Sequence, residues 1–278
     1  MASYCDARAN RGSWFVRIED LDRPRSRPAA EAQILTTLEH YGFAWDGAVL
    51  RQSERGEIYA AALERLRGAD AVYECACSRR ELVATSLYRD GERIYPGTCR
   101  SGIPESHGRR SQRAWRVRVG ETTIEFRDRL HGLQVQNLAR DAGDFVIKRA
   151  DGVYAYQLAA VVDDALQDVT HVVRGADLLR STPRQIMLQR LLGYPALSYL
   201  HTPIAIDAAG VKLSKQTNAA PLAEDALPTL IAAWRFLRQS LREQSEVATT
   251  VGEFWSSAIT AWDPGSLPPM ATLSAPGG

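Results

Sequence analysis

Strand and helix patterns alternate along most of this chain, and this alternation restricts its fold more than any other feature. Ile34, Leu35 and Leu38, for example, recur at helical spacing. The pattern predicts helices over residues 2–9, 29–40, 54–67, 156–165, 183–193, 227–242 and 253–261, and strands over residues 14–19, 71–77, 145–148, 168–174 and 199–206. Strands separated by helices form parallel sheets. We therefore expect an α/β fold with an open parallel sheet.

The alternation breaks between residues 78 and 142. This stretch holds a cysteine-bearing loop, a polar basic segment and two alternating strands over residues 114–119 and 122–128. We interpret it as a small β-rich module inserted into the sheet domain. The predicted domains are residues 1–77 and 143–206 for the sheet, 78–142 for the insert, 207–262 for a loop and short helical region, and 263–278 for a flexible tail.

Composition excludes several classes of protein. The chain has 278 residues, 45% hydrophobic and 24% charged, which does not fit disorder, collagen or a coiled coil. Its formal charge of +1 gives no global attraction to nucleic acid or membranes. A charged partner would therefore have to bind a local charged patch on the surface of the protein. There is no apolar run of roughly 18 residues and no apolar core of a secretory signal near the start. We expect a cytoplasmic protein without a membrane partner.

Charged residues of opposite sign end two of the predicted strands. Glu19 ends the strand over residues 14–19, and Arg174 ends the strand over residues 168–174. Ligands bind beyond the carboxyl ends of parallel strands, so both side chains are expected at one crevice. Together they suit a zwitterion, whose ammonium meets Glu19 and whose carboxylate meets the fork of Arg174. The alternative is an ordinary ion pair at the sheet edge.

Three of the four cysteines have the spacing of a metal site, namely Cys75, Cys77 and Cys99. Zinc takes four ligands, so one more is required. His107 is the conventional candidate and Tyr95 the unconventional one. Three buried thiols without a metal are the alternative interpretation.

Two groups of basic residues stand out against the neutral background. Six arginines and one acid, Glu105, lie between residues 100 and 118, which suits either a solvated loop or contacts to a phosphate backbone. Arginine supplies 31 of the 34 Lys and Arg side chains, yet two of the three lysines lie close together in Lys212-Leu213-Ser214-Lys215-Gln216. Exposed lysines on a loop can neutralise charge on a transferring triphosphate. This loop is therefore a candidate phosphate site.

Five motifs occur in the order seen in one known family. They are Arg17-Ile-Glu-Asp-Leu-Asp22, Cys75-x-Cys77 with Tyr95-x-x-x-Cys99, Tyr154-Ala-Tyr156 continuing to Asp164, Val173-Arg-Gly-Ala-Asp177, and Lys212-Leu-Ser-Lys-Gln216. Over residues 3–241 the chain thus resembles the glutamyl-Q tRNA(Asp) synthetases, which look like the catalytic half of a class I glutamyl-tRNA synthetase without an anticodon-binding domain. The resemblance implies a Rossmann-like sheet with a zinc-binding insert, and a ligase that activates L-glutamate with ATP and transfers it to the queuosine base of tRNA(Asp).

The resemblance also implies roles for single residues. Glu19, Tyr156 and Arg174 line the glutamate site, with Glu19 at the ammonium and Arg174 at a carboxylate. Lys215 is the catalytic, phosphate-binding lysine of a KMSKS-like loop, Lys212 also contacts ATP, and Mg²⁺ accompanies the nucleotide. The ligands for one Zn²⁺ per chain are Cys75, Cys77, Tyr95 and Cys99.

The start of the chain differs from the pattern of the family. Members begin with a strand, a Pro-rich turn and a HIGH-like motif that hold part of the ATP site, and the resemblance begins after these. We expect the first strand to be missing here, either because the gene product is longer or because the chain is a degenerate remnant, and we expect no adenylate from residues 1–278 alone. Two other functions stay open, a glutamyl-tRNA synthetase fragment acting on tRNA(Glu) and a noncatalytic tRNA- or zinc-binding remnant.

Overall fold

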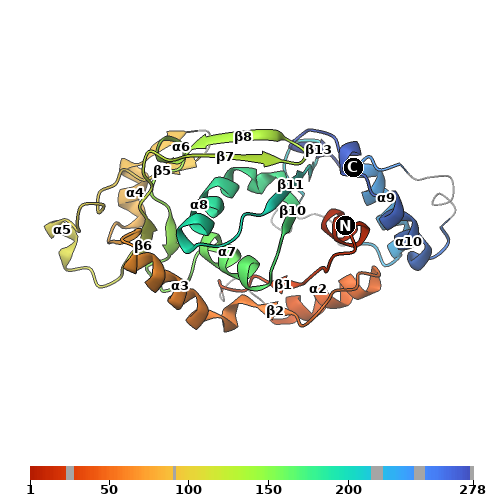
Figure 1. Cartoon of the computed structure of the whole chain (residues 1–278), viewed down its shortest axis with the longest axis horizontal. Coiled ribbons are helices and arrows are strands. Elements are labelled where there is room, and N and C mark those ends of the chain that lie inside the picture. The colour runs from red at the N-terminus through yellow and green to blue at the C-terminus, as the bar shows by residue number, and fades with distance from the viewer. Residues whose placement is uncertain (23–27, 90–91, 214–221, 241–247, 276–278) are drawn as a thin grey trace.

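Helices and strands alternate in the computed structural model of the chain, which describes residues 1–22, 28–89, 92–213, 222–240 and 248–275 (Figure 1). The α-helices are α1 Ala2–Ala9, α2 Pro28–His40, α3 Gly56–Gly68, α4 Arg79–Thr85, α5 Glu105–Gly108, α6 Leu138–Asp141, α7 Tyr156–Leu166, α8 Thr182–Leu192, α9 Ala226–Phe236 and α10 Val251–Ala261. The strands are β1 Arg17–Ile18, β2 Leu50–Arg51, β3 Val72–Cys75, β4 Leu87–Arg89, β5 Glu92–Ile94, β6 Ala114–Val117, β7 Thr123–Asp128, β8 Gly132–Asn137, β9 Val146–Lys148, β10 His171–Gly175, β11 Ser198–Thr202, β12 Ile204–Ile206 and β13 Thr272–Ser274. Short 3₁₀ helices are η2 Gln52–Glu54, η3 Ala176–Ser181 and η5 Pro264–Ser266.

The main sheet has the strand order β10-β11-β7-β8. β11 pairs in parallel with β10 and with β7, whereas β7 and β8 pair antiparallel. The α/β class is thus confirmed, but the sheet is mixed and not purely parallel as predicted. The physical reason is that Asp128 and Gly132 are joined by a tight turn, which can connect only antiparallel neighbours.

The strand predicted over residues 199–206 is divided by Pro203. β11 ends at Thr202 and β12 begins at Ile204, because proline has no N–H for a ladder hydrogen bond. β12 then pairs in parallel with β13. β13 lies where the sequence predicts a flexible tail.

Strands of the predicted insert pair with strands on both sides of it. β3, β6 and β9 form an antiparallel sheet in that order, while β4 and β5 form a separate hairpin. β7 joins the main sheet instead. The insert is therefore connected to the rest of the chain through shared sheets, and the division into domains stays a prediction.

Helices α7 and α8 lie between the main sheet and α3 (Figure 1). Residues 158–162 of α7 are all buried, since this helix has neighbours on several sides. Its apolar run therefore reflects packing on all faces. This packing holds Tyr156, at the start of α7, and Asp164, near its end, in fixed positions.

The two ends of the described chain pack together in a second core. Tyr4 of α1 contacts Trp255 of α10 edge to face at 4.8 Å between ring centroids, and the fully buried Trp234 and Phe254 lie in the same cluster. Figure 1 accordingly places α1 beside α9 and α10. Among the residues described, none of the helices combines the length and apolar character that a bilayer crossing requires.

Candidate functional site

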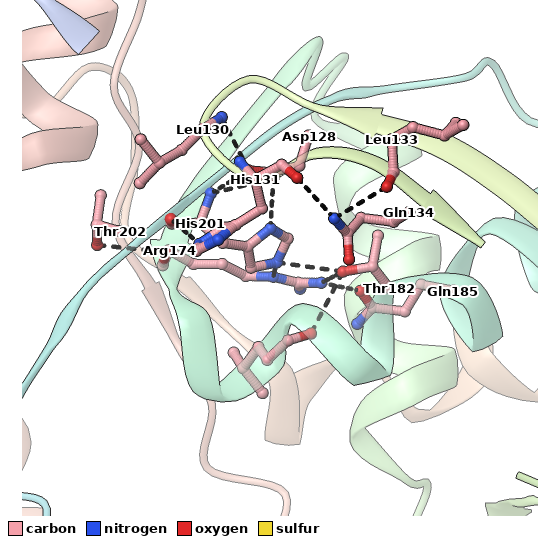
Figure 2. A network of polar contacts seen from close by, with 11 residues as sticks. Asp128, Leu130, His131, Leu133, Gln134, Arg174, Thr182, Gln185, His201 and Thr202 are labelled. Atoms are coloured by element: carbon pink, nitrogen blue, oxygen red, sulfur yellow. Dashed lines mark hydrogen bonds and ion pairs between the residues drawn. The ribbon is translucent and has the colours of Figure 1, made fainter. Parts of the chain in front are cut away.

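The side chain of Arg174, near the end of β10, bonds to four other side chains, and Figure 2 shows three of them, His201, Thr182 and Gln185. Its Nε donates to His201 Nε2 at 3.1 Å, and its Nη1 donates to Tyr156 Oη at 3.2 Å. Its Nη2 donates to Thr182 Oγ1 at 2.8 Å and to Gln185 Oε1 at 2.7 Å. Four of the five N–H groups of a guanidinium are thereby occupied. Within the described part of the chain, no carboxylate lies at ion-pair distance from Arg174.

His201, on β11, is oriented by the carboxylate of Asp128 at the end of β7 (Figure 2). His201 Nδ1 lies 2.7 Å from Asp128 Oδ2, and the backbone N–H groups of Leu130 and His131 donate to Asp128 Oδ1. A carboxylate only accepts hydrogen bonds, so Nδ1 carries the hydrogen and Nε2 presents its lone pair to Arg174. Burial lowers the pKa of His201, and the charge of Arg174 lowers it further, against the hydrogen bond to Asp128. The lowered pKa favours the neutral form of His201.

Arg174, His201 and Asp128 lie on three neighbouring strands of the main sheet, in the order β10, β11 and β7. Arg174 is directly opposite His201 in the β10–β11 register, and Asp128 is opposite Tyr199, two residues before His201. His201 is 0% and Asp128 is 1% exposed. Burial opposes ionisation of Asp128, but the hydrogen bonds from His201 and from two backbone N–H groups outweigh it and lower the pKa of this carboxyl.

Glu19 has Arg17 of β1 as its ion-pair partner, and not Arg174. Arg17 Nη2 lies 3.5 Å from Glu19 Oε1, and Arg17 Nη1 donates to Asp164 Oδ1 at 2.7 Å. Burial raises the pKa of Glu19 and that of Asp164, against the charge of Arg17. The charge of Arg174 also acts on Asp164. Asp164 therefore interacts electrostatically both with Arg174 and with Arg17, the ion-pair partner of Glu19.

An open cavity of about 770 Å³ lies between β1 and β10. Arg17 and Glu19 line one side, and residues 169–173 line the other. The lining stops at Val173, next to Arg174, and leaves out Tyr156. The three residues predicted to bind glutamate are therefore divided, with Tyr156 and Arg174 bonded to each other and Glu19 at the cavity.

Sequence reasoning missed the other members of the Arg174 cluster. Asp128 and His201 both stand at strand ends, the signal that singled out Glu19 and Arg174, but a lone histidine in an apolar strand resembles an ordinary core residue. Thr182 and Gln185 stand three positions apart in the first turn of α8, so both side chains reach one face of the helix. That spacing is the only sequence signal for this pair.

Lys212 lies close to the end of β10, where its Nζ bonds Asp177 Oδ2 at 2.6 Å. Asp177 also packs closely against Gly175. A Cβ at that position would lie only 2.5 Å from Asp177 Oδ1, so the contact requires glycine. Leu213 N donates to Ala205 O at 2.9 Å, which holds the start of the loop against β12. The remaining residues of the predicted KMSKS-like loop lie outside the described residues, namely Ser214, Lys215 and Gln216.

Three thiols and one phenol meet beside β3. The thiol sulfurs of Cys75, Cys77 and Cys99 all lie within 4.8 Å of one another, and the closest Cys77–Cys99 approach is 3.6 Å. Tyr95 Oη lies 3.4 Å from Cys75 Sγ and 3.5 Å from Cys77 Sγ. A tetrahedral zinc with bonds of about 2.3 Å to sulfur and about 2.0 Å to oxygen has ligand edges of about 3.8 Å between sulfurs and about 3.5 Å between sulfur and oxygen. This donor set fits a zinc ion.

His107 lies apart from the thiols, with its Nε2 3.1 Å from Glu81 Oε1. The geometry therefore brings Tyr95, and not His107, to the cysteine cluster. Arg116, 7% exposed, lies over the Tyr95 ring at 3.8 Å from its centroid. Burial opposes ionisation of Cys75, but its hydrogen bonds with Tyr95 and Arg116 outweigh burial and lower the pKa of this thiol.

The arginines between residues 100 and 118 mostly bond to the chain itself. Arg100 pairs with Asp144, and Arg110 donates twice to Glu81, at 2.6 and 2.8 Å. Arg113 and Arg118 donate to backbone carbonyls. These contacts favour a structural role for the basic stretch.

Comparisons with known proteins point to one family. Residues 1–243 match the family described as tRNA synthetases class I (E and Q), catalytic domain. The chain is 57% identical over 224 residues to a glutamyl-Q tRNA(Asp) synthetase of Thiobacillus denitrificans, covering 81% of this chain and 73% of that protein. It is 51% identical over 280 residues to the Aromatoleum aromaticum protein of the same name, covering 100% and 87%.

A solved structure has the same fold. It is a glutamate tRNA ligase from Elizabethkingia meningosepticum in complex with its amino acid, with a TM-score of 0.78 and 23% identity. The match covers 98% of this chain and 62% of that one, so the chain spans less than two thirds of its length.

Proposed function

Because the chain belongs to the class I tRNA synthetases of types E and Q, a family of ligases, we propose that it activates L-glutamate with ATP as glutamyl-adenylate. We further propose that it transfers the glutamyl group to the queuosine base of tRNA(Asp). The shared name of the similar bacterial proteins supports this acceptor. Because the acceptor is a tRNA, we propose that the protein acts in the cytoplasm.

The observation that carries this proposal is the environment of Arg174. A half-buried arginine is usually paired with a carboxylate, which offsets its charge. Arg174 is instead bonded to His201, Tyr156, Thr182 and Gln185, and it keeps one N–H on Nη1. Its charge is thus available to a carboxylate of glutamate, with Tyr156 bonded beside it.

Glu19 is the proposed partner of the substrate ammonium. Its carboxylate faces the open cavity, and its only ion-pair partner among the described residues is Arg17, at 3.5 Å. Burial raises the pKa of Glu19, and a bound ammonium would lower it again by favouring the charged form. Asp164, held by Arg17, adds negative charge on the same side.

The proposed nucleotide site lies beyond the end of β10, where open α/β sheets bind ligands. Lys212 is at this end, bonded to Asp177, and Lys215 follows it in the predicted loop. Their ammonium groups would bind the triphosphate of ATP, together with Mg²⁺, and stabilise the charge that develops on it during adenylate formation.

The cysteine cluster is the proposed zinc site, with one Zn²⁺ per chain. The ligands are Cys75, Cys77, Tyr95 and Cys99. The support is that Tyr95 Oη lies 3.4 and 3.5 Å from Cys75 Sγ and Cys77 Sγ and that Cys77 Sγ lies 3.6 Å from Cys99 Sγ, close to the edges of a tetrahedral set. When bound, the ion supplies a structural crosslink without an open coordination position. It would join β3 to the loop that follows β5 and so stabilise the insert.

The test is glutamate-dependent exchange of pyrophosphate into ATP, followed by transfer of labelled glutamate to purified tRNA. In a chain extended at its start by the strand and HIGH-like segment of the family, we expect exchange with glutamate and not with glutamine. In the same chain we expect transfer to queuosine-containing tRNA(Asp) but not to the same tRNA with guanine in that position. Transfer to tRNA(Glu) would identify a glutamyl-tRNA synthetase instead. Binding of tRNA or zinc without exchange would identify a noncatalytic protein.

A further inference from the structure

The four acceptors that bond Arg174 directly are all uncharged, and this feature deepens the proposed function on which it rests. Figure 2 shows the guanidinium among His201, Thr182 and Gln185, with Asp128 on the other side of the imidazole. The one carboxylate of the cluster is therefore separated from the guanidinium by a neutral ring. Arg174 is held by four hydrogen bonds, and no ion pair with a described residue neutralises its charge.

Gln185 shows that this arrangement costs stability. Its Oε1 accepts from Arg174 Nη2 at 2.7 Å, and the residue is 3% exposed. Its Nε2 is buried and has no hydrogen-bond partner within the described residues. Turning the amide over would place that N–H group against the guanidinium, so the unpaired donor is fixed by the bond to Arg174. A glutamate at this position would remove the unpaired donor and form an ion pair.

His201 can accept from Arg174 only if its tautomer is fixed, just as the orientation of the Gln185 amide is fixed. An imidazole can donate or accept at Nε2, depending on which nitrogen carries the hydrogen. Asp128 Oδ2, 2.7 Å from Nδ1, holds the hydrogen there and leaves the lone pair of Nε2 for Arg174 Nε at 3.1 Å. Asp128 also accepts from the backbone N–H groups of Leu130 and His131, in the turn between β7 and β8, and from the backbone N–H of His201 at 3.1 Å, so the turn and β11 together set its orientation.

We propose that Asp128, His201 and Gln185 are positioning residues that fix Arg174 through uncharged acceptors and so keep its positive charge for a carboxylate of glutamate. A fixed guanidinium needs no reorientation when the substrate arrives. Glutamine has no carboxylate in its side chain and gains nothing from an unneutralised charge at that position. The same three residues therefore contribute to the choice of glutamate over glutamine.

Gln185→Glu separates this proposal from a purely structural role. The new carboxylate would pair with Arg174 and remove the unpaired donor, so we expect an equal or higher melting temperature and at least about tenfold weaker L-glutamate binding by calorimetry. Gln189→Glu is the matched control, because Gln189 lies one turn further along α8, is 4% exposed and bonds Tyr199 at 2.9 Å. It should lower the melting temperature and leave the affinity within about twofold. Unchanged affinity in Gln185→Glu, or affinity lost together with stability, would overturn the proposal.

Two substitutions of His201 test the acceptor itself. Glutamine extends an amide oxygen to the position of Nε2, whereas asparagine reaches only the position of Nδ1. We expect His201→Gln to bind glutamate within about threefold of the natural chain and His201→Asn to bind about 10- to 100-fold more weakly, the loss expected for one hydrogen bond to a charged group. The reverse order would contradict the proposal.

The state of His201 can also be measured without substrate. Nitrogen-15 NMR of the whole chain at pH 7.5 should show a hydrogen on Nδ1 and none on Nε2. A hydrogen on Nε2 would overturn the positioning role. The expected tautomer in a chain that binds no glutamate would instead refute the proposed function while leaving the orientation of Arg174 established.

Discussion

Arg174 and His201 lie directly opposite each other on the parallel strands β10 and β11, and Arg174 Nε donates to His201 Nε2 at 3.1 Å. This pairing depends on the register of the sheet, because a shift of one residue would turn one side chain to the other face. Thr202 Oγ1 donates to the Arg174 carbonyl at 3.3 Å and adds a bond across the same two strands. The orientation of the guanidinium is therefore built into the sheet.

Replacing Arg174 with lysine should weaken glutamate binding although the charge is kept. Lysine has one ammonium with three donors and cannot bond His201, Tyr156 and Thr182 together while presenting a fork to a carboxylate. We expect about 10- to 100-fold weaker binding by calorimetry. Equal affinity in Arg174→Lys would remove this residue from the substrate site.

Glutamate binding should weaken as the pH falls through the lowered pKa of His201. Burial and the charge of Arg174 lower the pKa of His201, so the folded chain takes up this proton less readily than the unfolded chain, whose histidine titrates near pH 6.5. The stability contribution is therefore complete above about pH 6.5 and is lost as the pH falls toward the folded pKa. Protonation would also place an N–H of His201 against the N–H of Arg174 Nε, so the hydrogen bond that orients the guanidinium would be lost.

This pH dependence can be measured by calorimetry and urea unfolding between pH 7.5 and 5.5. His131, whose ring bonds the His201 carbonyl at 3.0 Å, and Glu19, whose pKa burial raises, are present in every variant. His201→Gln should therefore have a flatter profile than the natural chain. Identical profiles would assign the effect to those other groups.

Zinc content should depend on the four predicted ligands. Protein purified without added zinc is expected to carry about one Zn²⁺ per chain, and Cys99→Ser or Tyr95→Phe should lower this content in metal analysis. Hydrogen exchange in residues 100–118 should increase with the loss of metal. Cys5→Ala is the control, because this buried cysteine lies in α1, away from the cluster, and its loss should leave the zinc content unchanged. A folded, metal-free insert would contradict the assignment.

The lysine loop should affect the reaction with ATP and not the fold. In a chain extended at its start by the HIGH-like segment of the family, Lys215→Ala and Lys212→Ala are expected to reduce pyrophosphate exchange by about 100-fold or more, the size seen when one group that stabilises developing charge is removed. Lys148→Ala tests the third lysine, which lies over the Tyr154 ring at 4.7 Å and has no predicted contact with ATP. Equal losses in all three variants would point to general damage.

The sequence alone determined the features that depend on local pattern. Helical spacing and strand-like runs predicted most elements near their observed bounds, because neighbouring side chains decide which face of a helix or strand is apolar. The same reasoning placed Arg174 at the end of a strand and identified Cys75, Cys77 and Cys99 as a group with a metal spacing.

Only the tertiary structure decided which of these segments meet. Asp128 and His201 are 73 residues apart, and they become neighbours because β7 lies beside β11 in the main sheet. The same long-range packing brings Tyr95 to the thiols while His107 turns to Glu81, and it brings the first turn of α8 to Arg174. A local pattern specifies that a strand forms and which of its faces is apolar. The choice of its neighbour depends on how the whole chain buries those faces together, which no single segment encodes.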